Sequence, residues 1–414
     1  MQTGVWENLY QSVKKPPLDP VLTGFNANID RVIPVTPSLM RSFEEHAVEG
    51  FDTILPRLKR SMHTCSADEA VISDPSFYAA LSGSFSSSGT LSIGGQAGIA
   101  AVHLRRLGVP SVTCAVPGAG EKTCALLEDA GIIPLAFEPA AGAADSTHLV
   151  FEYPPGLVPL ADHVVPRSNR FIVSPLHDPS TAIIPEKAER SFLGRIAPCR
   201  RAFLSGYQYL RTEQEFKTAA RQIRLIRSVH PRMRTHVECV SGADRDVMAM
   251  MVRHIFTSTD SIGLNERELG LFMRVIQEPG PATERAPSSP ETLLCDLIAL
   301  ADATGAPRIH LHTFGYYMVI LKSGNLDTAS SQNALLLASR VTAGTAGKEH
   351  TLSREGLKAY TAVRNMSGAD EKPGIFCYNG HTVVFVPTYI AHDICRTTGL
   401  GDILSSTAFI ADPF

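Results

Sequence analysis

The stretch Leu91-Ser92-Ile93-Gly94-Gly95-Gln96-Ala97-Gly98 opens the segment that decides the predicted fold. Three strand-like residues run into two adjacent glycines, and a helix of small residues is expected over Ile99–Leu107. A second apolar strand is expected over Val109–Val116. Strand, turn, helix and strand in this order are typical of a parallel α/β unit. The sequence therefore predicts an α/β protein.

The same rhythm extends on both sides of this segment. Upstream, Val21–Asn26 reads as a strand, with Asn28 and Asp30 just beyond its end, where α/β folds often place ligand-binding side chains. Residues 76–90 read as a Ser/Gly-rich loop, and residues 131–185 break into short β-rich pieces that indicate a small domain or lid. Downstream, strands and helices alternate again. The strands are expected at Phe203–Ser205, Arg234–Val240, Ser261–Gly263, Arg308–Thr313 and Val383–Val386, and the helices at 213–228, 243–253 and 291–303, with another opening near Glu266.

Composition restricts the class of protein. The 414 residues are 44% hydrophobic and 19% charged, with a formal net charge of −3, which is typical of a soluble chain with a core. No Lys/Arg-rich run indicates binding to nucleic acid or to an anionic membrane, and no stretch is long enough to span a bilayer. The eight cysteines are scattered without a Cys-x-x-Cys pair, so we expect free thiols in a reducing cytoplasm.

A glycine-rich turn near the end of the sequence carries the clearest chemical signal. Gly399-Leu400-Gly401-Asp402 runs directly into the apolar helix expected over Ile403–Ile410. Glycines allow a close approach of the backbone, and the N–H groups of a first helical turn attract an anion. Asp402 would lie beside a transferring phosphate and could accept a hydroxyl proton. The structural alternative is an Asp that caps a helix after a Gly-rich turn.

Two further motifs combine glycine or amide groups with a helix start. Gly95 and Gln96 lie at a strand-to-helix junction, where the backbone can approach a ligand and the amide can hydrogen-bond it, although small residues there also favour close packing. Asn265 and Glu268 match a capping box. Alternatively, these two side chains would hold the water shell of Mg²⁺.

Two polar pairs remain. His236 and Glu238 share one face of a predicted strand, either as hydrogen-bonded core residues or in support of a metal–phosphate site. Arg167 and Arg170 are either solvated surface residues or a pair that binds phosphate bidentately.

Taken in order, these motifs resemble the ADP-dependent sugar kinases of the ribokinase superfamily, the archaeal-type ADP-dependent phosphofructokinases and glucokinases. The resemblance covers nearly the whole chain. It rests on Gly24–Asp30, Gly94–Gly98, Pro166–Phe171, Ser205–Gln208, His236–Glu238, Asn265–Glu268, His310–Tyr317 and Gly399–Asp402.

The resemblance implies a ribokinase-like architecture, with a large Rossmann-type α/β domain and a small β-rich lid. Sugar and nucleotide would bind in the cleft between them. Residues 1–33, 94–139 and 186–414 are assigned to the large domain, and residues 34–93 and 140–185 mainly to the lid.

The resemblance also implies roles for individual residues. Asp402 would be the general base, and Gly399, Leu400 and Gly401 would form the anion hole. The remaining roles are sugar hydroxyl binding by Asn28, Asp30, Gly95 and Gln96, a glucose-contacting acid at Glu69 or Asp68, anion binding by Arg167 and Arg170, an adenine pocket beside His312, and a Mg²⁺ site organised by Asn265 and Glu268 with support from His236 and Glu238.

The expected reaction is transfer of the β-phosphoryl group of ADP to fructose 6-phosphate, glucose or both, giving AMP and a phosphorylated sugar. Mg²⁺ is the expected cofactor, and a monomer or small homo-oligomer is the expected state. Two alternatives remain: an ATP-dependent ribokinase-type kinase, which shares the Gly-x-Gly-Asp turn, and an inactive sugar- or nucleotide-binding regulator. Gln96 and Arg31 depart from the family pattern and leave the sugar preference open.

Overall fold

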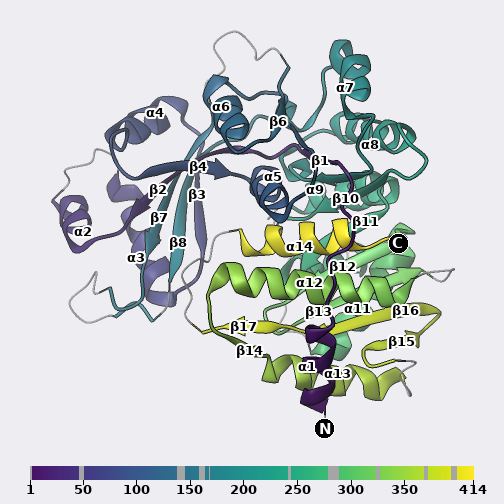
Figure 1. The fold of residues 1–414 in the computed structure, drawn as a ribbon. Coiled ribbons are helices and arrows are strands. Elements are labelled where there is room, and N and C mark those ends of the chain that lie inside the picture. Colours follow the sequence, from purple (N-terminus) through teal and green to yellow (C-terminus); the bar gives the residue numbers. More distant parts are fainter. Residues whose placement is uncertain are drawn as a thin grey trace.

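Two sheets of unequal size organise the chain in the computed structural model (Figure 1). The structure describes residues 2–45, 51–137, 145–157, 164–166, 168–240, 244–277, 289–322, 327–367, 372–392 and 399–414. Each sheet has a hydrophobic core of its own. This two-part α/β architecture confirms the predicted fold class.

The large sheet is parallel over most of its width. Its ten strands lie in the order β15 (Ile375–Tyr378), β16 (His381–Pro387), β13 (Tyr316–Lys322), β12 (Arg308–His312), β11 (Ser261–Asn265), β10 (Arg234–Glu238), β9 (Arg201–Leu204), β1 (Val21–Gly24), β5 (Val112–Ala115) and β6 (Ile133–Leu135). All neighbours from β12 to β6 are parallel, and β13, β16 and β15 add an antiparallel edge. The parallel strands are largely buried because helices cover both faces, and β10 and β12 are buried although they carry polar side chains such as His236 and His310.

Helices surround the large sheet. They are α1 (Gln2–Gln11), α5 (Gln96–Leu107), α6 (Glu121–Asp129), α7 (Glu189–Ile196), α8 (Glu213–Ser228), α9 (Arg245–Met250), α10 (Glu266–Gln277), α11 (Pro290–Thr304), α12 (Thr328–Ala346), α13 (Arg354–Ser367) and α14 (Leu400–Ala411). The helices α12 and α14 pack side by side (Figure 1). A short antiparallel pair, β14 (His350–Leu352) and β17 (Tyr389–Ala391), lies nearby. Among the described residues, no helix is both long and apolar enough to cross a membrane.

The small sheet has five strands in the order β3 (Asp68–Ile72), β8 (Asn169–Pro175), β7 (Thr147–Tyr153), β2 (Asn28–Pro34) and β4 (Thr90–Gly94). Helices α2 (Pro37–Glu44), α3 (Leu55–Thr64) and α4 (Pro75–Ser84) accompany it (Figure 1). Its core is aromatic, since the rings of Phe43, Phe51, Phe85 and Phe151 stack or meet edge to face. The small domain therefore has the packing to hold its own shape.

Two local predictions were wrong. The strands near Leu91 and Val109 do not form one parallel unit, because β4 pairs antiparallel with β2 in the small sheet, whereas β5 pairs with β1 in the large one. The helix α5 instead packs against the parallel strands β1 and β5 of the large sheet. The expected loop over residues 76–90 contains α4, which Asp74 caps by accepting hydrogen bonds from the N–H groups of Ser76 and Phe77.

The first predicted domain boundary, at residue 33, differs from the point where the chain enters the small sheet. Residues 1–33 were assigned to the large domain, yet β2 begins at Asn28 and lies in the small sheet. The chain therefore passes between the two sheets directly after β1, at the residues that carry the first predicted ligand-binding motif.

A buried ion pair fixes the carboxyl end of α14. The Arg308 Nε donates to Asp412 Oδ2 at 2.9 Å, and neither side chain is exposed. The Ser331 hydroxyl donates to the other oxygen of Asp412 at 2.7 Å. These bonds connect β12, α12 and α14, so the opposite end of α14 is held at a defined position.

Candidate active site

Side chains from both sheets line one cavity of about 320 Å³, which we call the central cavity. It brings together most of the residues singled out in the sequence: Asn28, Asp30, Glu69, Gly95, Gln96, Arg170, Glu238, Asn265, Glu268, His312, Gly399, Leu400, Gly401 and Asp402. His236 is fully buried behind Glu238. Arg167 lies outside the described residues, so the structure places only one member of the expected arginine pair.

The parallel strands explain part of this gathering. Glu238, Asn265 and His312 stand at the carboxyl ends of β10, β11 and β12, which are consecutive neighbours in the sheet. Carboxyl ends of parallel strands meet at one edge, where α/β folds bind ligands. The central cavity lies at that edge.

The amino end of α14 enters the cavity through the glycine turn. Gly399 is the residue before the helix and has a φ of 72°, which favours glycine. A Cβ there would lie 2.7 Å from Cγ2 of Ile99, so close packing also requires a glycine. The first backbone N–H groups of a helix have no partner inside that helix, and they attract anions. Asp402 follows in the same turn and lines the cavity beside them.

Glu238 is the centre of a buried hydrogen-bond network. It lies 3.0 Å from the Nε2 of His236 and 3.0 Å from the Nε2 of His312, and it accepts a bond from the Ser405 hydroxyl of α14. Burial alone would raise the pKa of Glu238, but the bonds to the two imidazoles outweigh it and the pKa falls to about 2. Burial lowers the pKa of His236, whereas the bond to Glu238 outweighs burial at His312 and raises its pKa.

This network requires a glycine on the neighbouring strand. A Cβ on Gly263 would lie 2.1 Å from Glu238 Oε2 and 2.6 Å from His236 Nε2. Gly263 therefore leaves the space in which the carboxylate and imidazole meet. The sequence left two interpretations for His236 and Glu238, core residues or site residues. Both hold, because His236 lies in the core and Glu238 lines the cavity.

Asn265 and Glu268 form the expected capping box. The Glu268 N–H donates to Asn265 Oδ1, and the Asn265 N–H donates to Glu268 Oε2, both at 2.9 Å. Both side chains also line the central cavity, where an amide and a nearly buried carboxylate offer oxygen atoms. Oxygen donors that leave room for water fit Mg²⁺, so the structural and the ligand-binding interpretations are compatible.

The opposite wall carries polar groups suited to hydroxyls. Asn28 Nδ2 donates to Asp30 Oδ1 at 2.7 Å, and Gln96 Nε2 donates to the Cys239 carbonyl at 3.0 Å. Among the described residues, Asn28 Oδ1 and Gln96 Oε1 are buried with no hydrogen-bond partner. Burial raises the pKa of Asp30 to about 6, partly offset by the Asn28 bond and the charge of Arg170. Buried acceptors without partners are costly, which indicates a ligand that donates here.

The structure separates the two acidic residues that the sequence left as alternatives. Asp68 forms a bidentate pair with Arg57 and does not line the cavity. Glu69 lines it, and its Oε1 accepts a bond from the Ser174 hydroxyl at 2.6 Å. Adjacent residues on a strand point to opposite faces, so only one of them can reach the cleft.

A second cavity of about 500 Å³, which we call the adjoining cavity, opens next to the first. Aromatic side chains of Phe314, Tyr317 and Tyr389 contribute to its wall. The two cavities share five residues: Arg170, Asn265, His312, Leu400 and Gly401. The amino end of α14 therefore lies at the junction between a polar cavity and a partly aromatic one.

Several residues of the central cavity were not singled out in the sequence. These are Asn26, Ile99, His148, Ile172, Tyr209, Cys239 and Val240. His148 had a detectable signal, since its imidazole directly precedes the apolar run Leu149-Val150-Phe151 of a strand. Asn26 lies just beyond β1, and Cys239 and Val240 directly follow β10, so these three stand at strand ends like the predicted residues. Ile172 and Tyr209 had no such signal.

The chain is similar to known proteins over most of its length. The model of the ADP-specific phosphofructokinase/glucokinase conserved region matches residues 19–411. An ADP-dependent glucose/glucosamine kinase from Pyrococcus furiosus is 28% identical over 98% of both chains. An ADP-specific phosphofructokinase from Methanosarcina acetivorans is 25% identical over 77% of this chain and 75% of its own.

Solved structures show the same fold. An ADP-dependent kinase in complex with fructose 6-phosphate and ADPβS superposes with a TM-score of 0.75 at 20% identity, covering 99% of this chain and 96% of that chain. A reconstructed last common ancestor of ADP-dependent phosphofructokinases from Methanosarcinales gives 0.73 at 21% identity over 99% and 96%.

Proposed function

The chain belongs to the ADP-specific phosphofructokinase/glucokinase family, and we propose that it transfers the β-phosphoryl group of ADP to a sugar hydroxyl. The products are AMP and a phosphorylated sugar. One observation carries this proposal: the glycine turn of α14 lies where the central and adjoining cavities meet. A sugar in the central cavity and a nucleotide in the adjoining cavity would bring the transferred phosphoryl group to that turn.

Asp402 acts as the general base in this proposal. It accepts the proton of the attacking hydroxyl, while the N–H groups of Leu400 and Gly401 stabilise the charge on the transferring group. Arg170 lines both cavities and neutralises phosphate charge from the other side. Arg167, which lies outside the described residues, is proposed as its companion.

Mg²⁺ is the proposed cofactor, held through water by Asn265 and Glu268. When bound, it would neutralise charge on the phosphate oxygens. Glu238, ionised and hydrogen-bonded by His236 and His312, supplies a fixed negative charge at the same edge of the sheet. That charge favours a nearby cation and positions His312 between the two cavities.

For the acceptor we propose fructose 6-phosphate, with glucose also accepted. Asn28, Asp30, Gly95 and Gln96 offer groups that bind hydroxyls common to both sugars. Glu69 supports a neutral hexose, since a carboxylate accepts hydroxyl bonds but repels a phosphate. Arg170 supports the phosphorylated sugar. The M. acetivorans and P. furiosus relatives carry these two specificities in their names.

Remaining expectations concern the cellular setting. We propose a cytoplasmic enzyme that works as a monomer or small homo-oligomer. Cys114, Cys124, Cys199, Cys239 and Cys295 are free thiols, which is compatible with a reducing compartment.

A direct test follows the phosphoryl group. Purified protein is incubated with ADP, Mg²⁺ and either sugar, and AMP and sugar phosphate are quantified. The proposal expects the two products in equal amounts and no AMP without sugar. Sugar-independent release of phosphate would indicate a hydrolase, and binding of both ligands without any product would favour the regulator alternative.

A further inference from the structure

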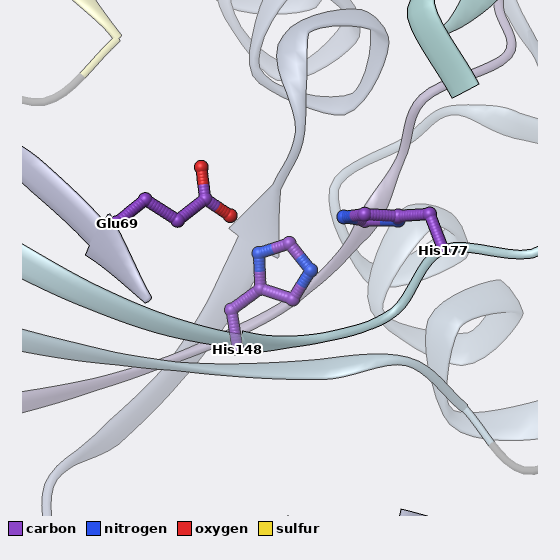
Figure 2. Close-up of side chains that lie close together, drawn as sticks. All are labelled: Glu69, His148 and His177. Carbon is purple, nitrogen blue, oxygen red and sulfur yellow. The ribbon is translucent and has the colours of Figure 1, made fainter. Parts of the chain in front are cut away.

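Glu69, His148 and His177 form a cluster of metal-ligating side chains that the proposed reaction does not use as a group. One ligand atom from each of these residues lies within 4.8 Å of the others. Figure 2 shows the carboxylate of Glu69 and the ring of His177 on either side of the His148 ring, all directed toward a common space. The three residues come from β3, from β7 and from the segment after β8, so the small sheet itself brings them together.

His148 and His177 each have a ring nitrogen that is available to bind a metal. Within the described part of the chain, the Nε2 atoms of His148 and His177 are buried and have no hydrogen-bond partner. The His148 side chain is only 8% exposed and is aimed into the cluster (Figure 2). Burial lowers the pKa of His148 to about 3 and that of His177 to about 4. An imidazole nitrogen with no hydrogen-bond partner can bind a metal through its lone pair.

The neighbouring rings hold His177 in place. Its imidazole stacks on Tyr209 with centroids 3.9 Å apart, and it meets the His148 ring edge to face at 5.1 Å. Glu69 is exposed and is restrained through the Ser174 hydroxyl bond on one oxygen. The imidazoles thus pack against other rings, and the exposed carboxylate, held through one oxygen, is the group that can close around an ion.

From this geometry we propose that Glu69, His148 and His177 bind one first-row transition-metal cation of the Zn²⁺ type. Two imidazoles and one carboxylate are a ligand set for Zn²⁺ or Co²⁺ that leaves a position for water. Ligand atoms about 2.1 Å from a tetrahedral metal lie about 3.4 Å apart, so separations of up to 4.8 Å shorten by up to about 1.4 Å when the ion binds. Mg²⁺ prefers oxygen ligands, so this site differs from the one at Asn265 and Glu268.

The position of the cluster implies that a bound metal would affect sugar binding. Glu69 and His148 line the central cavity, whereas His177 lines a neighbouring cavity on the other side. A metal bound here occupies the carboxylate that we assign to the sugar. Metal and sugar then compete, so the site is inhibitory; this consequence rests on the proposed function, whereas metal binding does not.

The test uses the full chain without an affinity tag that binds metal. Co²⁺ is titrated into the protein and binding is followed by its visible absorption, with Zn²⁺ displacement as a second readout. The test variant is His177→Phe, which keeps the ring on Tyr209 and removes both nitrogens. The control is His63→Phe, which removes an exposed imidazole from α3 of the same domain.

Wild type and the His63→Phe variant are expected to bind one equivalent of Co²⁺, and the His177→Phe variant to bind at least about tenfold more weakly. In the kinase assay with Mg²⁺ in excess, Zn²⁺ raises the KM for sugar in the wild type and not in the His177→Phe variant. Equal Co²⁺ affinity in the wild type and the His177→Phe variant, or no Co²⁺ binding by the folded wild type, overturns the site. Co²⁺ binding without any kinase activity would overturn the proposed function and leave the metal site standing.

Discussion

Asp402 is the residue on which the proposed chemistry depends most. The Asp402→Asn variant retains the size of the side chain and loses the group that accepts a proton. We expect turnover to fall by about 10²- to 10⁴-fold, with the dissociation constant for the sugar nearly unchanged. Steady-state kinetics and calorimetric sugar binding measure the two quantities.

The matched control is Asp246→Asn, which alters an exposed carboxylate in the first turn of α9. It should leave turnover unchanged. Near-normal turnover in the Asp402→Asn variant would remove Asp402 from the mechanism and leave it as a helix-start residue.

Asp30 predicts a specific dependence of stability on pH. Its pKa is raised to about 6 in the folded protein from an ordinary 3.8, so the unfolded chain loses this proton first as pH rises. The folded state is therefore favoured by Asp30 below pH 3.8, and that contribution is lost as pH rises through about 6. Two pKa units correspond to about 3 kcal/mol.

The Asp30→Asn variant removes this titration. The free energy of unfolding of the wild type, relative to that of the variant, should fall by up to about 3 kcal/mol between pH 4 and pH 7. Denaturant unfolding at both pH values gives the comparison. A constant difference between the two proteins would show that Asp30 titrates normally.

At the residue scale, the sequence predicted polar groups that follow strand ends or glycine turns. Asn28, Asn265, His312 and Asp402 all reach the central cavity, because such positions are fixed by local chain geometry. Tyr209 and His177 were missed. Their environments depend on contacts between segments far apart in the chain, which a single sequence does not contain.

Among the elements, α14 is held at both ends. Its amino end depends on Gly399, where a side chain meets Ile99 and a positive φ disfavours any other residue. Gly399→Ala should cost about 1–2 kcal/mol from the backbone alone, with an added cost from the clash. Turnover should fall as well, since the N–H groups of the turn are displaced.

A second substitution separates these two costs. Ile99→Ala removes the atoms that a new Cβ would meet, so the double variant should regain part of the stability lost by Gly399→Ala. Thermal unfolding of both single variants and the double variant measures the coupling. Strict additivity would show that Ile99 does not confine the turn.

The carboxyl end of α14 depends on the buried pair of Arg308 and Asp412. Removing one partner leaves an unpaired buried charge, so Arg308→Met should lower the free energy of unfolding by about 3–5 kcal/mol. The double variant Arg308→Met with Asp412→Leu should be more stable than the single variant. If the single variant unfolds like the wild type, the pair does not hold the helix.

At the element scale, strongly patterned segments were predicted well. The helix over 213–228 was found at α8 with the same bounds, because Thr212 and Glu215 form a capping box before an amphipathic run. The strand at Leu91 was predicted correctly, but its predicted partner, the strand near Val109, was wrong. Local sequence indicates a strand, whereas its partner is decided by where the chain crosses between sheets.

At the scale of the whole molecule, residues proposed to bind the sugar and residues proposed to organise the metal site lie on different sheets. Asp30 and Glu69 belong to the small sheet, and Glu238 and Asn265 to the large one, yet all four line one cavity. The two-part α/β class followed from the strand and helix rhythm together with the β-rich interruption. The place of β2 in the small sheet did not, because residues 1–33 were assigned to the large domain.

The central claim is that ADP donates a phosphoryl group to a sugar at the glycine turn of α14. The most direct measurement is a kinase assay with ADP or ATP as donor against fructose 6-phosphate or glucose as acceptor, with Mg²⁺ throughout. The account predicts AMP and sugar phosphate from ADP with fructose 6-phosphate, and also with glucose, and little product from ATP. Turnover with ATP alone, or no turnover with any pair, would contradict it.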